Sequence, residues 1–71
     1  MFTGIQVDPE IMGGTPVFKG TRVPIKTLFD YIEGESTIDD FLIDFPSVTK
    51  EQVIHLLEHL KAQAIHPLKA A

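Results

Sequence analysis

The chain has 71 residues, a formal net charge of −4 and no cysteine, which describes one small domain of marginal stability. The lack of cysteine excludes disulfides and thiolate metal sites and fits a reducing cytosol, and the negative charge disfavours tight non-specific nucleic-acid binding, which depends on lysine and arginine. The sequence begins without a signal peptide and holds no apolar run of about 20 residues, so we expect a cytoplasmic protein without a membrane span.

The N-terminal third predicts a short β-hairpin followed by a rigid turn. Ile5 and Val7 alternate with polar residues, and residues 16–18 ("PVF") form a second extended run. In "GTRVP", Gly20 supplies a backbone angle that other residues resist, and Pro24 has a helical φ at the first helical position. A hairpin of this size is marginally stable alone, so we expect it to pack on helices or on another chain.

Two amphipathic helices are predicted next. The first covers residues 24–33, with Gly34 as its stop. The second begins at Thr37 as N-cap and carries Asp39 and Asp40 in its first turn, where the helix dipole favours anions. Their apolar residues recur at helical spacing: Ile25, Leu28, Phe29 and Ile32 in the first helix, then Ile38, Phe41, Leu42 and Phe45 in the second.

The third predicted helix has the strongest start signal. Thr49 and Gln52 form a capping box, and Val48 can pack on Val53 as a hydrophobic staple. We expect this helix to fray before Pro67, because proline cannot donate the helical hydrogen bond. Its buried face is predicted to hold Val53, Leu56, Leu57 and Leu60.

Together these elements predict one mainly α domain, a three-helix bundle of the homeodomain-like helix-turn-helix type with a short N-terminal strand segment. We expect the strand and turn segment at residues 5–23, the bundle at 24–64 and a flexible tail at 65–71. The short link between the second and third helices fits a helix-turn-helix, but the same lengths describe bundles that never touch DNA.

Catalysis is not expected. The stretch "HLLEH" places His55, Glu58 and His59 in an H-x-x-E-H pattern, and histidines four apart can share a metal. Only His66 remains downstream as a third ligand, and a chain of this size leaves no room for a substrate cleft. We interpret this stretch as a solvated helix face and predict no enzyme, no metal and no cofactor.

Charges divide along the sequence, which indicates where partners bind. All charged residues in positions 11–29 are cationic, and all charged residues in positions 30–48 are acidic. This division of charge suits a cationic partner at least as well as DNA. Arg22 either pairs inside the fold, with Asp8, with Glu10 or with the carbonyls of a helix end, or it binds a phosphate or a partner's carboxylate. The candidate residues for a partner or a phosphate are Lys19, Thr21, Arg22 and Lys26.

A recognition helix would present polar residues outward from the third helix. Gln52 can make bidentate bonds to adenine, unless the capping box already occupies it. The candidate DNA-binding residues are Lys50, Gln52, His55 and His59.

The stretches "VDPEIMGGTPVFKGTRVPIKTLFDYIEGE" and "FLIDFPSVTKEQVIHLL" closely resemble the DUF433 family of small proteins, predicted antitoxin components of type II toxin-antitoxin systems. The resemblance covers nearly all of residues 5–62. It implies a homeodomain-like helix-turn-helix with a short strand region, a PIN-like ribonuclease toxin as partner, and operator DNA as a second ligand. We expect only some seven residues after the third helix, too few to wrap a toxin, so an antitoxin of this kind would inhibit through its folded body or its N-terminal strands.

From residues and resemblance we expect a non-enzymatic, antitoxin-like protein that acts as a homo-oligomer, most simply a dimer. We expect residues 13–24 to hold a rigid strand edge for self-association or toxin docking, with the acidic second helix facing the cationic surface of a nuclease. The alternatives are a stand-alone helix-turn-helix transcriptional regulator and an oligomerising protein-interaction module without DNA binding.

Overall fold

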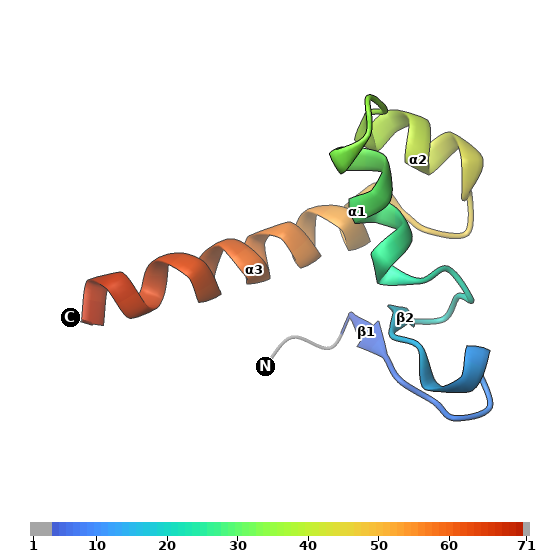
Figure 1. Ribbon diagram of the computed structural model, residues 1–71, viewed down its shortest axis with the longest axis horizontal. Helices are drawn as coiled ribbons and strands as arrows, with labels where there is room; N and C mark the ends of the chain where they lie inside the picture. Colours follow the sequence, from blue (N-terminus) through green and yellow to red (C-terminus); the bar gives the residue numbers. More distant parts are fainter. Residues whose placement is uncertain (1–3, 71) are drawn as a thin grey trace.

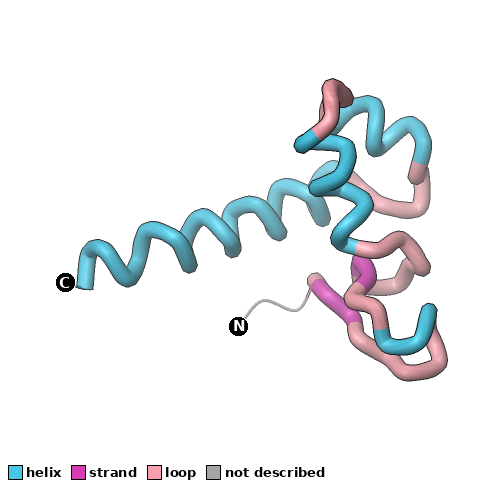
Figure 2. Tube along the Cα trace, in the orientation of Figure 1, coloured by secondary structure: helices cyan, strands magenta, loops and turns pink. Residues whose placement is uncertain are grey.

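The computed structural model describes residues 4–70, with the side chains of residues 4–65. Three helices follow a two-stranded antiparallel hairpin (Figures 1 and 2), as the sequence predicts. The elements in chain order are β1 (Ile5–Gln6), the 3₁₀ turn η1 (Met12–Gly14), β2 (Val17–Phe18), α1 (Ile25–Glu33), α2 (Ile38–Asp44) and α3 (Lys50–Ala70).

The hairpin is built so that β2 lies between two extended segments. On one side β1 pairs with β2, with Ile5 opposite Phe18. On the other side Val17 bridges to Pro24, and the Phe18 N–H donates to the Val23 carbonyl at 3.0 Å. The expectation of a free strand edge within residues 13–24 is therefore wrong for β2, because both of its edges are already hydrogen-bonded; the outer edge of the sheet belongs to β1.

A tight turn returns the chain from β2 toward α1. Gly20 has φ +78°, in the left-handed region where glycine is favoured, and the Thr21 hydroxyl donates to the Phe18 carbonyl at 2.8 Å. The same hydroxyl accepts the Val23 N–H at 3.0 Å. Pro24 is the N-cap, with an extended ψ of 141°, and not the first helical residue as predicted. Its carbonyl is thereby free to accept the Thr27 N–H at 3.1 Å.

Side chains at the starts of α2 and α3 cap both helices. Thr37 Oγ1 accepts the Asp40 N–H at 3.1 Å, and Asp40 Oδ2 accepts the Thr37 N–H at 3.0 Å. The predicted box at α3 is confirmed, since Thr49 and Gln52 exchange the equivalent bonds at 3.0 and 3.1 Å. Each cap satisfies backbone donors that the first helical turn leaves open.

The hydrophobic core joins the hairpin to all three helices. Phe41 of α2 is fully buried, and its ring centroid lies 5.9 Å from that of Phe18, 5.5 Å from that of Tyr31 and 5.1 Å from that of Phe45. β2 and the turn after it therefore form one wall of the core. The buried residues are Val17, Phe18, Val23, Leu28, Phe41, Val48, Val53 and Leu56.

α3 departs from the prediction in both its length and its burial. It runs to Ala70, beyond the predicted end before Pro67, because a proline inside a helix can kink it without ending it, although the missing N–H and the ring clash cost about 3 kcal/mol. Leu60, predicted to be buried, is 39% exposed, since α3 projects away from the rest of the fold (Figure 1). Flexibility of residues 65–71 stays a prediction, and residue 71 lies outside the described residues.

Tyr31 and Asp44 link α1 to α2 through a titratable hydrogen bond. The Tyr31 hydroxyl donates to Asp44 Oδ2 at 2.6 Å, and this bond, with smaller effects of desolvation and of the charges of Asp44 and Asp40, raises the pKa of Tyr31 above 10.0. A phenol whose pKa is higher in the folded state adds stability that is complete well below the unfolded pKa and is lost as the pH rises through the folded pKa.

We predict that the stability difference between the wild type and Tyr31→Phe is constant well below pH 10.0 and shrinks above it. Tyr31 is the only tyrosine and there is no tryptophan, so phenolate absorbance titrates this group alone. Asp44→Ala should return its pKa toward the ordinary value, whereas Asp39→Ala should not. An unchanged titration in Asp44→Ala would show that the hydrogen bond does not set the pKa.

Candidate functional site

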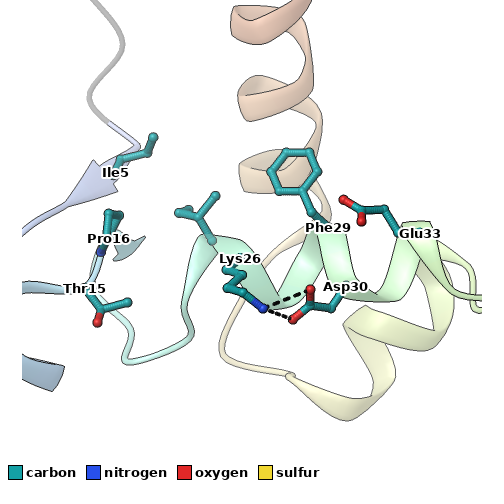
Figure 3. A pocket seen from close by; sticks show the side chains of 8 residues that line it. Ile5, Thr15, Pro16, Lys26, Phe29, Asp30 and Glu33 are labelled. Carbon is teal, nitrogen blue, oxygen red and sulfur yellow. Dashed lines mark hydrogen bonds and ion pairs between the residues drawn. The ribbon is translucent and has the colours of Figure 1, made fainter.

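An open groove lies between the hairpin and α1 (Figure 3), with a volume of about 700 Å³. Ile5 of β1 and Pro16, just before β2, form one side, and Ile25 and Phe29 of α1 form the other. Volumes of this size are typical of ligand-binding pockets. Polar residues complete the lining: Thr15, Lys26, Asp30 and Glu33.

The polar residues give the groove a net negative rim. Lys26 Nζ lies 2.9 Å from Asp30 Oδ2 and 3.1 Å from Asp30 Oδ1. The hydrogen bond to Asp30, followed by the charges of Asp30 and Glu33, raises the pKa of Lys26. One cation therefore faces two carboxylates along α1. A groove with apolar sides and an acidic rim can bind an apolar side chain that has a cation beside it.

The candidate partner or phosphate residues do not act as one cluster. The Thr21 hydroxyl makes its hydrogen bonds within the turn, and Lys26 forms an ion pair with Asp30. Arg22 is exposed and makes no hydrogen bond or ion pair with any described residue, so the predicted pairing with Asp8 or Glu10 is wrong. The Asp8 carboxylate instead accepts the Glu10 N–H at 2.9 Å, which stabilises the loop after β1. Arg22 and the exposed Lys19 remain available cations beside the turn.

Gln52, a candidate base-reading residue, uses its side-chain amide for two hydrogen bonds within the fold. Its Oε1 closes the α3 capping box, and its Nε2 donates to the Lys19 carbonyl at 3.0 Å. This second bond fastens the start of α3 to the turn after β2. The sequence predicted the cap, but the bond to residue 19 spans 33 positions and has no local signal.

The other candidate DNA-binding residues lie along the first half of α3. Lys50 and His55 are exposed, and His59 is half-buried. Glu51, His55 and Glu58 share one exposed helix face by their spacing, so carboxylates accompany the histidine on that face. Such a face is less suited to the phosphates of DNA than a row of lysines and arginines.

The H-x-x-E-H stretch, residues 55–59, lies within α3. Within the side chains that the structure describes, no group of three histidine or acidic residues is placed to hold a metal ion. The third ligand considered, His66, has a side chain outside that range.

Among the described helices, none is long and apolar enough to cross a membrane.

Sequence reasoning missed the groove itself. The sequence predicts Ile5 as a strand residue and Phe29 as a core residue, and both also line the groove between the hairpin and α1. A partial signal was present in Lys26, Asp30 and Glu33, whose i, i+4 and i+7 spacing places them on one face of α1. The apolar sides of the groove had no such signal, because they form only when Ile5 and Pro16 lie opposite α1 in the folded chain.

The fold and the groove define a small, mainly helical domain in which a β-hairpin completes the core. The family described as "Protein of unknown function (DUF433)" matches residues 5–60, and the chain belongs to this family. The chain is similar to the "Uncharacterized protein y4eO" of Sinorhizobium fredii (strain NBRC 101917 / NGR234), with 36% identity over 45 residues, which cover 63% of this chain and 20% of that protein. The match thus spans about one fifth of this relative's length.

The fold is also that of a crystal structure of a DUF433 member from Anabaena variabilis ATCC 29413. The TM-score is 0.68, with 24% sequence identity, over 96% of this chain and 69% of that chain. This likeness supports the arrangement of the hairpin and helices.

Proposed function

We propose that this protein is a non-enzymatic, antitoxin-like module of the cytoplasm that binds a PIN-like ribonuclease and self-associates as a dimer. The observation that carries this proposal is an acidic surface on α1, α2 and the loop between them. No lysine or arginine occurs between residues 27 and 49. The exposed acids of this surface are Asp30, Glu33, Glu35, Asp39, Asp40 and Asp44.

Electrostatics favours a basic protein as the ligand of this acidic surface. A nuclease that binds RNA needs a cationic surface to hold phosphates, and an acidic surface is complementary to it. The same acids would repel a nucleic acid. An inhibitor can therefore cover the RNA-binding surface of a nuclease with its folded body and needs no long extension. The nuclease class comes from the family resemblance.

The test is binding to the product of the adjacent reading frame, co-expressed and then measured with purified components. Glu35→Lys combined with Asp39→Lys should weaken binding about tenfold or more at low salt, with a smaller loss at high salt. Glu51→Lys with Glu58→Lys changes the net charge equally on α3 and serves as the matched control. If both double variants weakened binding equally, or if the wild type did not bind the adjacent gene product, the acidic surface would not be the docking site.

Operator DNA is a second candidate ligand because α2 and α3 are joined through residues 45–49, and Lys50 and His55 are exposed at the start of α3. Binding to upstream DNA should then weaken steeply with salt, and Lys50→Ala should lower the salt slope by about one. If the protein did not bind upstream DNA, or if that binding did not depend on salt, DNA would be excluded as a ligand and only the proposed protein partner would remain.

A further inference from the structure

The outer edge of β1 presents the backbone groups of one residue, Ile5. Ile5 lies opposite Phe18 in the hairpin. One pair earlier, the Lys19 N–H donates to the Gly4 carbonyl at 2.9 Å. Hydrogen-bonded and non-hydrogen-bonded pairs alternate along an antiparallel ladder, so Ile5 belongs to a non-hydrogen-bonded pair. Its N–H and carbonyl therefore point away from β2, and no described residue bonds to either group.

The side chain of Ile5 lines the groove between the hairpin and α1 (Figure 3). Residues directly opposite each other in an antiparallel pair share one face of the sheet. A strand added to the outer edge of β1 would therefore place one side chain beside Ile5, on the groove side. Pro16 and Phe29 line the same groove and offer apolar contacts to that side chain. Backbone bonds and side-chain contacts are thus available at one position.

The acidic rim of the groove favours a cation in such a strand. Lys26 is paired with Asp30. The exposed Glu33 carboxylate, in contrast, accepts no hydrogen bond from a described residue and forms no ion pair with one. The next side chain on the same face of a strand is two residues along, so a lysine or arginine at that position complements Glu33.

We propose that the groove binds an extended segment of a basic protein, which pairs antiparallel with the outer edge of β1. The residue opposite Ile5 is apolar and exchanges two backbone hydrogen bonds with it, and a lysine or arginine two positions along faces Glu33. This inference rests on the proposed function, because Asp30 and Glu33 also belong to the acidic surface, and it adds the chemistry of the segment that docks there.

A basic protein segment suits this site better than a second copy or a nucleic acid. A second copy carries the same acidic rim and the same net charge of −4, so pairing β1 with β1 of another copy would bring like charges together. The carboxylates of the rim would also repel the phosphates of a nucleic acid. Only a segment that combines apolar and cationic side chains matches both the sides and the rim of the groove.

The first test uses the full chain and a synthetic peptide, acetyl-Thr-Val-Thr-Lys-Thr-Val-Thr-amide, whose lysine and valines share one face of a strand. In NMR titrations of the isotope-labelled protein, the amide resonance of Ile5 should shift saturably, and that of Ile43, exposed on α2, should not. Replacing the peptide's lysine with glutamate should weaken binding about tenfold at low salt. An unshifted Ile5 amide, or equal binding of the two peptides, would overturn the proposal.

Backbone N-methylation of the peptide separates strand pairing from side-chain attraction. In the antiparallel arrangement the residue opposite Ile5 uses its own N–H and carbonyl, so methylating the backbone nitrogens of the lysine and valines should abolish binding. Methylating those of the threonines is the matched control and should leave binding nearly unchanged. The reverse pattern, or no effect of either set, would overturn the pairing with β1.

A charge exchange tests the contact with Glu33. Glu33→Lys should weaken binding of the lysine peptide and strengthen binding of the glutamate peptide. Glu35→Lys makes the same charge change outside the groove lining and should do neither. Both residues are exposed, and circular dichroism melting reports whether each variant folds. Equal effects of the two variants would overturn Glu33 as the contact.

The peptide experiments also separate this inference from the proposed function. If the adjacent gene product binds through the acidic surface but the peptide does not bind, only the groove inference fails. If the peptide binds as described and the gene product does not, only the proposed partner fails.

Discussion

Phe41→Ala is expected to lower the free energy of unfolding by about 3–5 kcal/mol, the usual cost of removing a buried phenylalanine ring. Phe41 is fully buried and its ring packs against Phe18, Tyr31 and Phe45. Globular proteins have about 0.05–0.15 kcal/mol of stability per residue, which gives roughly 4–10 kcal/mol for a chain of this length. The loss is therefore comparable with the whole stability of the monomer.

Urea denaturation followed by circular dichroism measures this effect. Ile43→Ala is the matched control because Ile43 belongs to the same helix and is 75% exposed, so its change should stay within about 0.5 kcal/mol. A loss below about 1 kcal/mol for Phe41→Ala would show that the aromatic cluster is not the centre of the core.

Phe18→Ala is expected to cost about 3 kcal/mol or more, because Phe18 is 1% exposed and fills the core from β2. This variant tests the role of the glycine- and proline-rich segment 13–24. If that segment were mainly a docking edge, the fold would tolerate the change and only binding would suffer. The structure instead makes β2 and the following turn a wall of the core, so unfolding should be the main effect.

Lys19→Ala, at the next and exposed position, is the control for Phe18→Ala in the same urea experiment. The double variant Phe18→Ala with Phe41→Ala should cost less than the sum of the two single variants, because the rings contact each other and their removal is coupled. Additive losses would indicate that the two rings act independently in the core.

These stability predictions set the controls for the binding experiments. The groove is formed by the hairpin and α1, and Phe18 and Phe41 belong to the core that joins them to α2. A substitution in the core would disturb every binding surface at once. The variants chosen for partner binding are therefore exposed residues, where a loss of binding can be separated from a loss of fold.

The sequence by itself determined the features that depend on neighbours within about one helical turn. Thr37 and Thr49 start their helices through side-chain bonds to residues three positions ahead, and such local bonds can be read from residue type and spacing. The apolar faces of α1 and α2 likewise follow from their periodicity, except that Ile32, which the pattern places on the buried face of α1, is 40% exposed.

Only the tertiary structure decided which apolar residues are covered. Leu56 and Leu60 occupy similar positions in the helical pattern, but Leu56 is buried and Leu60 is 39% exposed, because the body of the fold ends between them. Gln52 reaches the Lys19 carbonyl for a comparable reason: the bond exists because packing brings the two segments together. Burial and long-range bonds depend on where elements meet in space, and periodicity along one helix carries no information about where its neighbours end.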